Sequence, residues 1–415
     1  MLQTLVQLKA GELAGVSRLA LSEGLTEFPS EIFNLAESLE ILDLSGNRLS
    51  SLPDDFHRLK HLKVLFLSNN AFEVFPSVLG RCERLEMIGF KSNRIGSVAE
   101  GALPRQTRWL ILTDNCITAL PEGLGGLARL QKLMLAGNQL QQLPASIKRC
   151  ESLELVRISA NRLQSFPEQL LELPRLAWLA FAGNPFCHSI EAPQELPAVE
   201  FDDLVLGDVL GSGASGIISR AHWKNNSFDF PADVAVKCFK GGVTSDGYVQ
   251  DELHATLQAG RHHNLVSPLA SIAGKGLVMR LIPGEYKNLA GPPSFASCTR
   301  DVFPAEFKLP LALVASMVAQ IESVVEHLHG RNLCHGDLYA HNMLLSEGSG
   351  HVLFGDFGAA SFCGGLADFV RGGIQRIERR ALGFFIEDLL TVCDSSDVVD
   401  EQYAQLQQKA REYLA

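Results

Sequence analysis

The sequence lacks an uninterrupted hydrophobic run of membrane-spanning length. Of its 415 residues, 46% are hydrophobic and 20% are charged, which is ordinary for a globular protein. The nearest candidate, residues 309–325, is interrupted by Gln320 and Glu322, whereas a transmembrane helix needs about 20 mostly apolar residues. We therefore expect an amphipathic helix there and no membrane span.

The sequence also lacks a secretory signal pattern and any pairing pattern among its cysteines. The first residues, MLQTLVQLKAGELAGV, show no basic start followed by an apolar core. The nine cysteines form no C-x-x-C pair and no metal-ligand spacing. A reducing compartment is the simplest setting for scattered cysteines, and we expect a cytoplasmic protein.

A basic face is missing as well. Residues 1–190 hold 19 basic and 19 acidic side chains, while residues 191–415 hold 17 and 28, so the second half carries the whole net charge of −11. Because nucleic-acid binding requires clustered positive charge, we expect no nucleic-acid partner.

What the first half does contain is an internal repeat. Each copy follows L-x-x-L-x-L-x-x-N-x-L, as in LEILDLSGNRL, and the asparagines recur every 22 or 23 residues. The x-L-x-L segment predicts a short strand with inward leucines, and the asparagine satisfies backbone groups at the turn. The pattern resembles the leucine-rich repeat family, and the resemblance implies a curved solenoid with a parallel sheet. The repeated asparagines are Asn47, Asn70, Asn93, Asn115, Asn138, Asn161 and Asn184.

Positions between the inward leucines predict a concave surface that is unusually apolar. Such patches often mark a protein-binding surface. Three interpretations stay open: a protein partner binds this surface, the chain's own second half covers it, or it has no role. The predicted partner-binding residues are Phe66, Trp109, Ile111, Met134 and Trp178.

The repeat pattern is lost near residue 190, where a proline-rich stretch follows. We therefore predict a repeat domain of about eight repeats at 1–190, a short linker at 191–200 and a second domain at 201–415. That domain opens with LGDVLGSGASGIISRAHW, in which Gly211, Gly213 and Gly216 precede an alternating, strand-like segment. A strand–loop–strand hairpin of this kind can cover phosphates with its backbone N–H groups.

Motifs for phosphate chemistry follow in order. VAVKCFK offers Lys237 as a cation for phosphates, and the next helix offers Glu252 as its partner, with Asp251 as the second candidate. Farther along come HGDLYAHN at residues 335–342 and GDFG, which contains Asp356. This ordered set resembles a eukaryotic-type protein kinase domain.

The resemblance implies ATP and Mg²⁺ as cofactors and a role for each motif residue. Asp337 is expected to accept the proton of the substrate hydroxyl, and Asn342 and Asp356 are expected to bind Mg²⁺. Glu378 stands where an aspartate is usual in the helix after the activation segment. The expected ATP-binding residues are Gly211, Gly213, Gly216, Ile218, Ala235, Lys237, Met279 and Leu281.

Residues 335–342, which correspond to the catalytic loop of protein kinases, depart from the family pattern at three positions. Gly336 replaces the arginine that pairs with a phosphorylated activation loop in many kinases, so this domain resembles the non-RD kinases and that switch is expected to be absent. Tyr339 and His341 match neither the serine/threonine nor the tyrosine pattern cleanly. We lean to serine/threonine specificity on family frequency.

The activation segment, from Asp356 to Glu378, is short and lacks the A-P-E motif. Few residues follow the helix after it, so we expect a short lower lobe. The sequence thus predicts an α/β leucine-rich-repeat solenoid followed by a two-lobed α+β protein-kinase-like domain with a short C-lobe. The expected function is protein phosphorylation, with the repeats binding a protein substrate or regulator. Two alternatives stay open: an inactive kinase-fold scaffold, and a small-molecule phosphotransferase of the aminoglycoside or choline kinase type, since HGD also occurs there.

Overall fold

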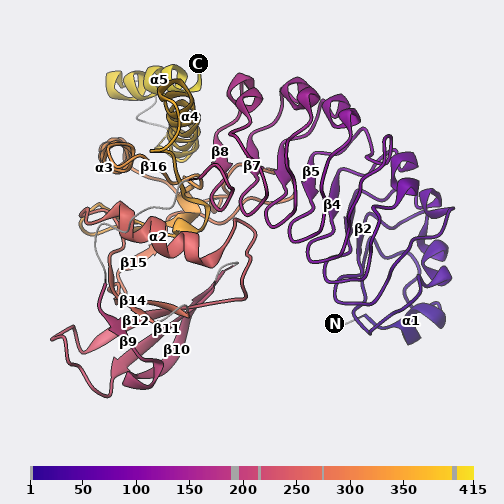
Figure 1. Ribbon diagram of the computed structural model, residues 1–415, viewed down its shortest axis with the longest axis horizontal. Coiled ribbons are helices and arrows are strands. Elements are labelled where there is room, and N and C mark those ends of the chain that lie inside the picture. Colours follow the sequence, from indigo (N-terminus) through magenta and orange to yellow (C-terminus); the bar gives the residue numbers. More distant parts are fainter. Residues whose placement is uncertain (1–2, 188–195, 214–215, 273–274, 395–399) are drawn as a thin grey trace. The chain divides into compact units, whose positions relative to one another are not determined.

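The computed structural model describes residues 3–187, 196–213, 216–272, 275–394 and 400–415 (Figure 1). The chain divides into two compact units. The first comprises Met1–Leu176 and Asn184–Phe186, and the second comprises Ala177–Gly183 and Cys187–Ala415. The second unit therefore includes a short segment that the repeat pattern assigns to the first half. The predicted boundaries at 190 and 201 stay predictions.

The first unit contains a parallel sheet of short strands, as the repeat predicted. Each strand pairs in register with the next, for example Leu42 with Leu65, and the central residue of each is buried. Three-residue strands suffice because neighbouring repeats supply the core that one repeat lacks. The strands are β1 (Arg18–Ala20), β2 (Ile41–Asp43), β3 (Val64–Phe66), β4 (Met87–Gly89), β5 (Trp109–Ile111), β6 (Lys132–Met134) and β7 (Leu155–Arg157).

Most of the segments between these strands contain a short helical turn, but the one between β4 and β5 does not, and a capped helix precedes the sheet. Helix α1 (Leu5–Lys9) begins with a capping box in which Thr4 and Gln7 satisfy each other's backbone N–H groups. The 3₁₀ helices are η1 (Ser30–Leu35), η2 (Phe56–Arg58), η3 (Ser77–Arg81), η4 (Glu122–Gly126), η5 (Ala145–Arg149) and η6 (Glu168–Glu172).

The repeated asparagines hold adjacent turns together. Asn138, which is 6% exposed, accepts a hydrogen bond from the N–H of Ile117 at 3.0 Å. Its amide group donates to the carbonyls of Leu112 and Leu135 at 2.8 and 3.0 Å. The other six asparagines bond to the backbone in the same way. One side chain thus pairs backbone groups of two repeats that the short strands leave unpaired.

The second unit begins with a strand-rich lobe (Figure 1). Its six strands are ordered β10-β11-β12-β14-β13-β9, all antiparallel except the last pair. Residues 191–195 of the predicted linker lie outside the described residues, and β9 lies within the remainder of it. The strands are β9 (Ala198–Val199), β10 (Leu204–Ser212), β11 (Gly216–Trp223), β12 (Asp233–Phe239), β13 (Pro268–Ile272) and β14 (Gly276–Arg280), with helix α2 (Val249–Ala259) between β12 and β13.

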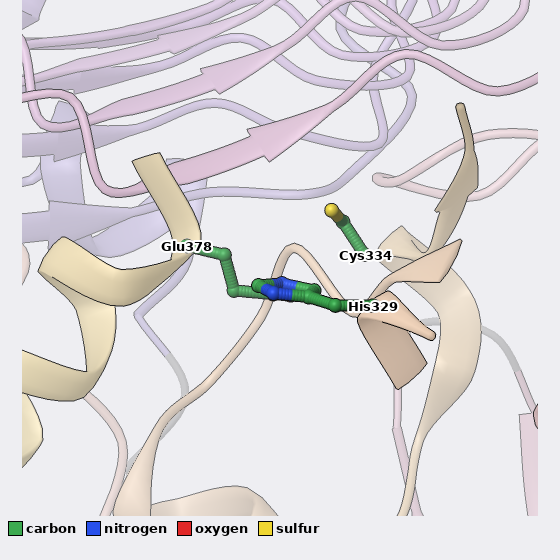
Figure 2. A group of neighbouring side chains, drawn as sticks. All are labelled: His329, Cys334 and Glu378. Carbon is green, nitrogen blue, oxygen red and sulfur yellow. The ribbon is translucent and has the colours of Figure 1, made fainter. Parts of the chain in front are cut away.

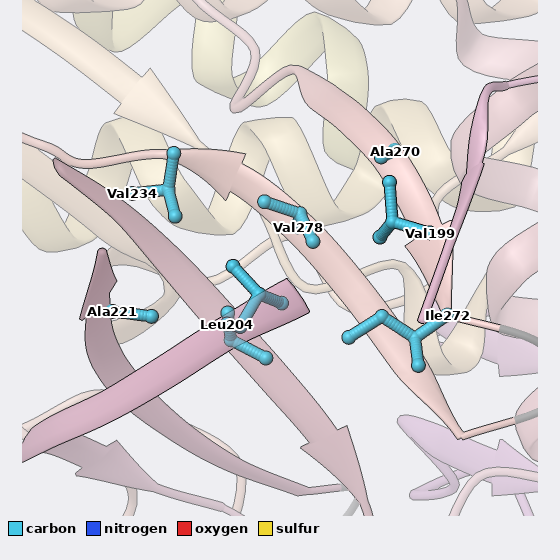
Figure 3. Close-up of a cluster of buried hydrophobic side chains, with 8 residues drawn as sticks. Val199, Leu204, Ala221, Val234, Ala270, Ile272 and Val278 are labelled. Atoms are coloured by element: carbon cyan, nitrogen blue, oxygen red, sulfur yellow. The ribbon is translucent and has the colours of Figure 1, made fainter. Parts of the chain in front are cut away.

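The two faces of this sheet have different roles. One face carries a buried aliphatic cluster that includes Val234, Val236 and Val278 (Figure 3). The opposite face carries the predicted ATP-binding residues, because Ile218 pairs with Lys237 and Ala235 pairs with Met279, and alternate residues of a strand share a face. The strand pattern therefore gathers four predicted nucleotide-binding residues on one surface.

A helical lobe follows, built on α3 (Leu311–His329), α4 (Asp368–Thr391) and α5 (Glu401–Leu414). A strand-rich lobe followed by a helical lobe confirms the predicted architecture of the second unit. The remaining elements are β8 (Trp178–Ala180), η7 (Phe201–Asp203), β15 (Tyr286–Asn288), β16 (Leu333–Cys334), η8 (Ala340–Asn342), β17 (Met343–Ser346), β18 (His351–Phe354), η9 (Phe357–Ala359) and β19 (Ser361–Phe362).

Helix α3 corresponds to the predicted amphipathic helix. Among the described residues, it alone has the length and hydropathy that could cross a membrane, a test that core helices of soluble proteins also pass. One side of α3 is buried within its unit, including Met317, Ile321 and Leu328. The absence of a membrane span stays a prediction.

Removing one asparagine of the ladder tests its contribution. We expect Asn138→Ala to lower the free energy of unfolding of the first unit by about 3 kcal/mol, since each buried group left unpaired costs about 1–3 kcal/mol. Urea denaturation followed by circular dichroism measures the change. The control is Gln142→Ala at an exposed position of the same repeat, and equal midpoints for the two variants would contradict the assignment.

Candidate functional site

A buried lysine links three elements of the second unit. Lys237 of β12 forms an ion pair with Glu252 of α2, and its Nζ also lies 3.2 Å from Oδ1 of Asp356. The side chains of Lys237 and Glu252 are 8% and 4% exposed, whereas that of Asp356 is 51% exposed. The partner of the lysine is Glu252 rather than the second candidate, Asp251. The ion pairs place one cation between two carboxylates beside the predicted nucleotide-binding face.

The ionisation states in this group follow from its charges. Burial by itself lowers the pKa of Lys237, but the charges and hydrogen bonds of Asp356 and Glu252 outweigh burial and raise it. For Asp356, burial acts to raise the pKa, and the charge and hydrogen bond of Lys237 lower it below its ordinary value. Lysine and carboxylate are therefore both charged at neutral pH, which phosphate and cation binding require.

Asp356 is held in an unusual backbone conformation. Its φ and ψ are 60° and 78°, in the left-handed region, which non-glycine residues seldom adopt. Such conformations cluster at functional sites, where the surrounding structure imposes them. The next residue, Phe357, is buried, and its ring centroid lies 4.9 Å from that of His335. The buried phenylalanine anchors the segment while the carboxylate stays partly open to solvent.

In the catalytic loop, the side chain of Asn342 holds Asp337 in position. Nδ2 of Asn342 donates to Oδ2 of Asp337 at 2.7 Å and to its backbone carbonyl at 3.0 Å. Both residues are half-buried. Because the amide nitrogen makes these bonds, the amide oxygen of Asn342 faces away from Asp337. An amide oxygen and the Asp356 carboxylate are hard oxygen donors of the kind that Mg²⁺ prefers.

A buried carboxylate forms hydrogen bonds to the backbone of the catalytic loop. Oε1 of Glu378, on α4, accepts hydrogen bonds from the N–H groups of His335 and Gly336 at 2.5 and 2.9 Å. Its other oxygen lies 2.7 Å from Nε2 of His329. Burial acts to raise the pKa of Glu378, but the hydrogen bond and charge of His329, with the backbone N–H groups, lower it. The side chain of Glu378 thus reaches the loop from the position where the protein kinase pattern predicts an aspartate.

Glu378 belongs to a buried group with His329 and Cys334 (Figure 2). Their donor atoms lie within 4.8 Å of one another, as the ligands of a metal ion do. A hydrogen bond with Cys363 and burial raise the pKa of Cys334 well above its ordinary value. Glu378 and His329 bond to each other, and Glu378 also bonds to the backbone of the catalytic loop. These two residues therefore form a hydrogen-bonded support of the loop.

His335 has the bracing role that buried histidines usually have. Its Nε2 lies 3.0 Å from the carbonyl oxygen of Gly355, and its ring stacks on Phe354 at 4.0 Å. Burial lowers its pKa. It thereby links the catalytic loop to the residue that precedes Asp356.

The unusual loop residues are all engaged within the unit. Gly336 has φ of +72°, and a Cβ there would lie 2.6 Å from the carbonyl oxygen of Leu179 and 2.7 Å from that of Ala359. Nδ1 of His341 lies 2.6 Å from a carboxylate oxygen of Asp301. The ring of Tyr339 stacks on Trp178 with centroids 4.5 Å apart. These residues therefore hold the loop in place through contacts within the unit.

The predicted glycine loop is partly described. Gly211 and Gly213 have space around them, since a Cβ at either position would have no atom of the described residues within 4 Å. A Cβ at Gly216, in contrast, would lie 2.6 Å from the carbonyl oxygen of Cys238. Residues 214–215 lie outside the described residues. Of the other predicted ATP-binding residues, Ile218, Met279 and Leu281 are half-buried and Ala235 is buried.

The predicted partner-binding residues separate into two groups. Phe66, Trp109, Ile111 and Met134 are half-buried residues of the repeat sheet. Trp178 is only 1% exposed and belongs to the second unit. Its prediction as part of an exposed binding surface is wrong, because its ring is enclosed by Tyr339 and Phe384. Trp178 is covered by residues of its own unit.

Sequence reasoning missed two supports of the site. His329 and Asp301 bond to Glu378 and His341, but each pair is separated by many residues and follows no spacing rule. Their polar character beside apolar segments was the only available signal, and it does not identify a partner.

Comparisons with known proteins match two families to parts of the chain. Residues 204–365 match the family described as protein tyrosine and serine/threonine kinase, and residues 18–72 and 37–95 match leucine rich repeat. The chain thus contains a protein kinase domain and leucine-rich repeats.

Two curated relatives match part of the chain. Fibroblast growth factor receptor 1 of Pleurodeles waltl is 26% identical over 205 residues, which cover 45% of this chain and 25% of that protein. Glycogen synthase kinase-3 homolog YGK3 of Saccharomyces cerevisiae is 28% identical over 161 residues, which cover 37% of this chain and 41% of that protein. The chain thus spans less than half the length of either. A solved leucine-rich repeat protein of Leptospira interrogans is 28% identical, covers 41% of this chain and 50% of its own, and has a TM-score of 0.34.

The charge of Glu378 should make the stability of the second unit depend on pH. Because the folded pKa of Glu378 lies below its ordinary value of 4.5, its ionised form stabilises the fold above pH 4.5, and this contribution is lost as pH falls toward the folded pKa. We expect Glu378→Gln, which keeps one acceptor oxygen, to lower stability at pH 7 and to flatten its decline as the pH falls below 4.5. Urea midpoints across this range measure the effect.

The control is Glu347→Gln, at an exposed turn. Parallel pH profiles for Glu378→Gln and the unsubstituted protein would show that Glu378 carries no such linkage.

Proposed function

We propose that the chain is an ATP-dependent protein kinase that transfers the γ-phosphate of ATP to a protein hydroxyl. The observation that carries this proposal is the ion-paired set of Lys237, Glu252 and Asp356 in the unit that also holds Asp337 and Asn342. An inactive kinase-fold scaffold has no need of these charged residues, and keeping a lysine buried requires the carboxylates that the site retains.

Each residue has a separate part in this proposal. Lys237, held by Glu252, binds the α- and β-phosphates, and the glycine loop covers them through its backbone. Asp337 accepts the proton of the attacking hydroxyl, with Asn342 fixing its carboxylate. The oxygen donors of Asn342 and Asp356 fit Mg²⁺, which neutralises phosphate charge when bound. The half-exposed Asp356 carboxylate leaves space for such a cation.

We propose serine or threonine as the acceptor, on family frequency. One curated relative is a receptor of the fibroblast growth factor type and the other is a glycogen synthase kinase-3 homolog, so the relatives do not favour one acceptor. Tyr339 and His341 occupy the loop positions that differ between the two classes, and both are engaged within the unit. Phosphoamino-acid analysis of the product distinguishes the two acceptors.

We further propose that the repeats hold the protein substrate or a regulator in a cytoplasmic setting. Phe66, Trp109, Ile111 and Met134 lie on the same sheet, at the strand positions that alternate with the buried leucines. Nζ of Lys132 lies 4.2 Å from the Trp109 ring centroid, which adds a cation to an otherwise apolar row. Aromatic and methionine side chains of this kind are enriched in protein interfaces.

Substitution of the expected base tests the catalytic proposal. Asp337→Asn should lower transfer of labelled phosphate from ATP and Mg²⁺ to protein by at least about 100-fold, because general-base catalysis contributes about 10²–10⁴-fold. ATP affinity should change little, since Asp337 contacts the hydroxyl and not the nucleotide.

The matched control is Asp233→Asn, an exposed aspartate in β12 of the same unit. If the unsubstituted protein binds ATP but transfers no phosphate to itself or to any supplied protein, the kinase proposal is wrong. Transfer restricted to small alcohols would instead indicate a small-molecule phosphotransferase.

A further inference from the structure

The segment Ala177–Gly183 is built into the kinase-containing unit. Trp178 lies in its strand β8 and is 1% exposed. The indole ring stacks on Tyr339 at 4.5 Å with an interplanar angle of 6°, and on Phe384 of α4 at 5.3 Å and 17°. Its Nε1–H donates to the carbonyl oxygen of Leu338 at 3.0 Å. The tryptophan thus bonds to and packs on the two residues that directly follow Asp337.

The same segment also holds the strand that follows Asp356. The N–H groups of Phe181 and Ala182 both donate to Oγ of Ser361, at 2.9 and 3.2 Å. Ser361 lies in β19 and pairs with Cys334 in β16, directly before the catalytic loop. A buried serine therefore couples the segment to both sides of the catalytic centre.

A third contact explains the glycine at 336. Any side chain there would meet the carbonyl oxygen of Leu179 at 2.6 Å. The position where related kinases often have an arginine, the partner of a phosphorylated activation loop, therefore lies against the backbone of this segment. An arginine at 336 and the present path of Leu179 exclude each other sterically.

A fourth contact reaches the helix that carries Glu252. A Cβ on Gly183 would lie 2.7 Å from Tyr248 and 2.7 Å from Oδ2 of Asp251, at the start of α2. The segment therefore extends from the catalytic loop to the helix that positions Lys237. These are the parts that must be correctly placed together for phosphoryl transfer in protein kinases.

We propose that Trp178 and Ser361 are positioning residues, and that Ala177–Gly183 permanently holds the catalytic loop in the arrangement that activation-loop phosphorylation produces in other kinases. The inference rests on the proposed kinase function. Trp178 acts on Asp337 through Leu338 and Tyr339, and Ser361 acts through β19 and β16. Activity consequently requires no phosphate on the short segment between Asp356 and α4.

The test compares full-length variants in phosphate transfer and in ATP binding. Trp178→Ala and Ser361→Ala should each lower kcat by about 10–100-fold, since small displacements of catalytic groups cost up to about 100-fold. The KM and Kd for ATP should stay within about twofold, because neither residue lies on the nucleotide-binding face. Trp178→Phe, which keeps a ring but lacks the indole N–H, should have an intermediate kcat.

The matched control is Trp223→Ala. Trp223, in β11, also donates its indole N–H to a backbone carbonyl at 3.0 Å, that of Pro231, and packs beside Phe230. If the effect of Trp178→Ala were a general loss of folding, Trp223→Ala would produce a similar loss and ATP affinity would fall in parallel. Should Trp178→Ala not fold, the smaller changes Ser361→Ala and Trp178→Phe decide the outcome.

The outcomes separate the two proposals. Absence of transfer by the unsubstituted protein would overturn the kinase function itself. Transfer by the unsubstituted protein, with kcat unchanged in folded Trp178→Phe and Ser361→Ala, would overturn the positioning role alone. Phosphatase treatment before the assay should leave kcat within about twofold, and a fall to the level of Ser361→Ala would show that the loop requires phosphate after all.

Discussion

The burial of one carboxylate, that of Glu378, sets the position of the catalytic loop. A buried ionised group is stable only with hydrogen-bonding partners around it, and Glu378 finds them in the N–H groups of His335 and Gly336 and in His329. The requirement joins the end of α3, the centre of α4 and the loop before Asp337. Displacing any of them leaves a charge unpaired in the core, so the loop and the two helices are fixed together.

The upper part of the site depends on a second set of buried charges. Lys237 is stabilised by Glu252 and Asp356 together, and either carboxylate alone would leave the lysine less well compensated. Asp356 is in addition held in a left-handed backbone conformation. The charged groups of the site thus hold one another in place through their ion pairs. His335 adds a contact to the backbone carbonyl of Gly355.

Much of this organisation was predictable from the sequence. The repeated asparagines and leucines predicted the parallel sheet because the same local backbone hydrogen bonds form in each repeat and require the same spacing. The ordered phosphate-chemistry motifs indicated Lys237, Glu252, Asp337, Asn342 and Asp356, and the structure brings Lys237 together with Glu252 and Asp356, and Asp337 with Asn342. What no motif could show was that Trp178, apparently one more outward residue of a repeat, is enclosed by Tyr339 and Phe384.

The sequence by itself determined the two architectures and the chemical inventory of the site, because both rest on periodicity and on motifs with local physical causes. Only the tertiary structure decided how the departures from the family pattern are accommodated. Each of these departures contacts a residue that is distant in the sequence. Gly336 lies against Leu179, Tyr339 stacks on Trp178, and Glu378 bonds to His329. Close packing and hydrogen-bond pairing between distant segments create these relations, and neither leaves a regular spacing in the sequence.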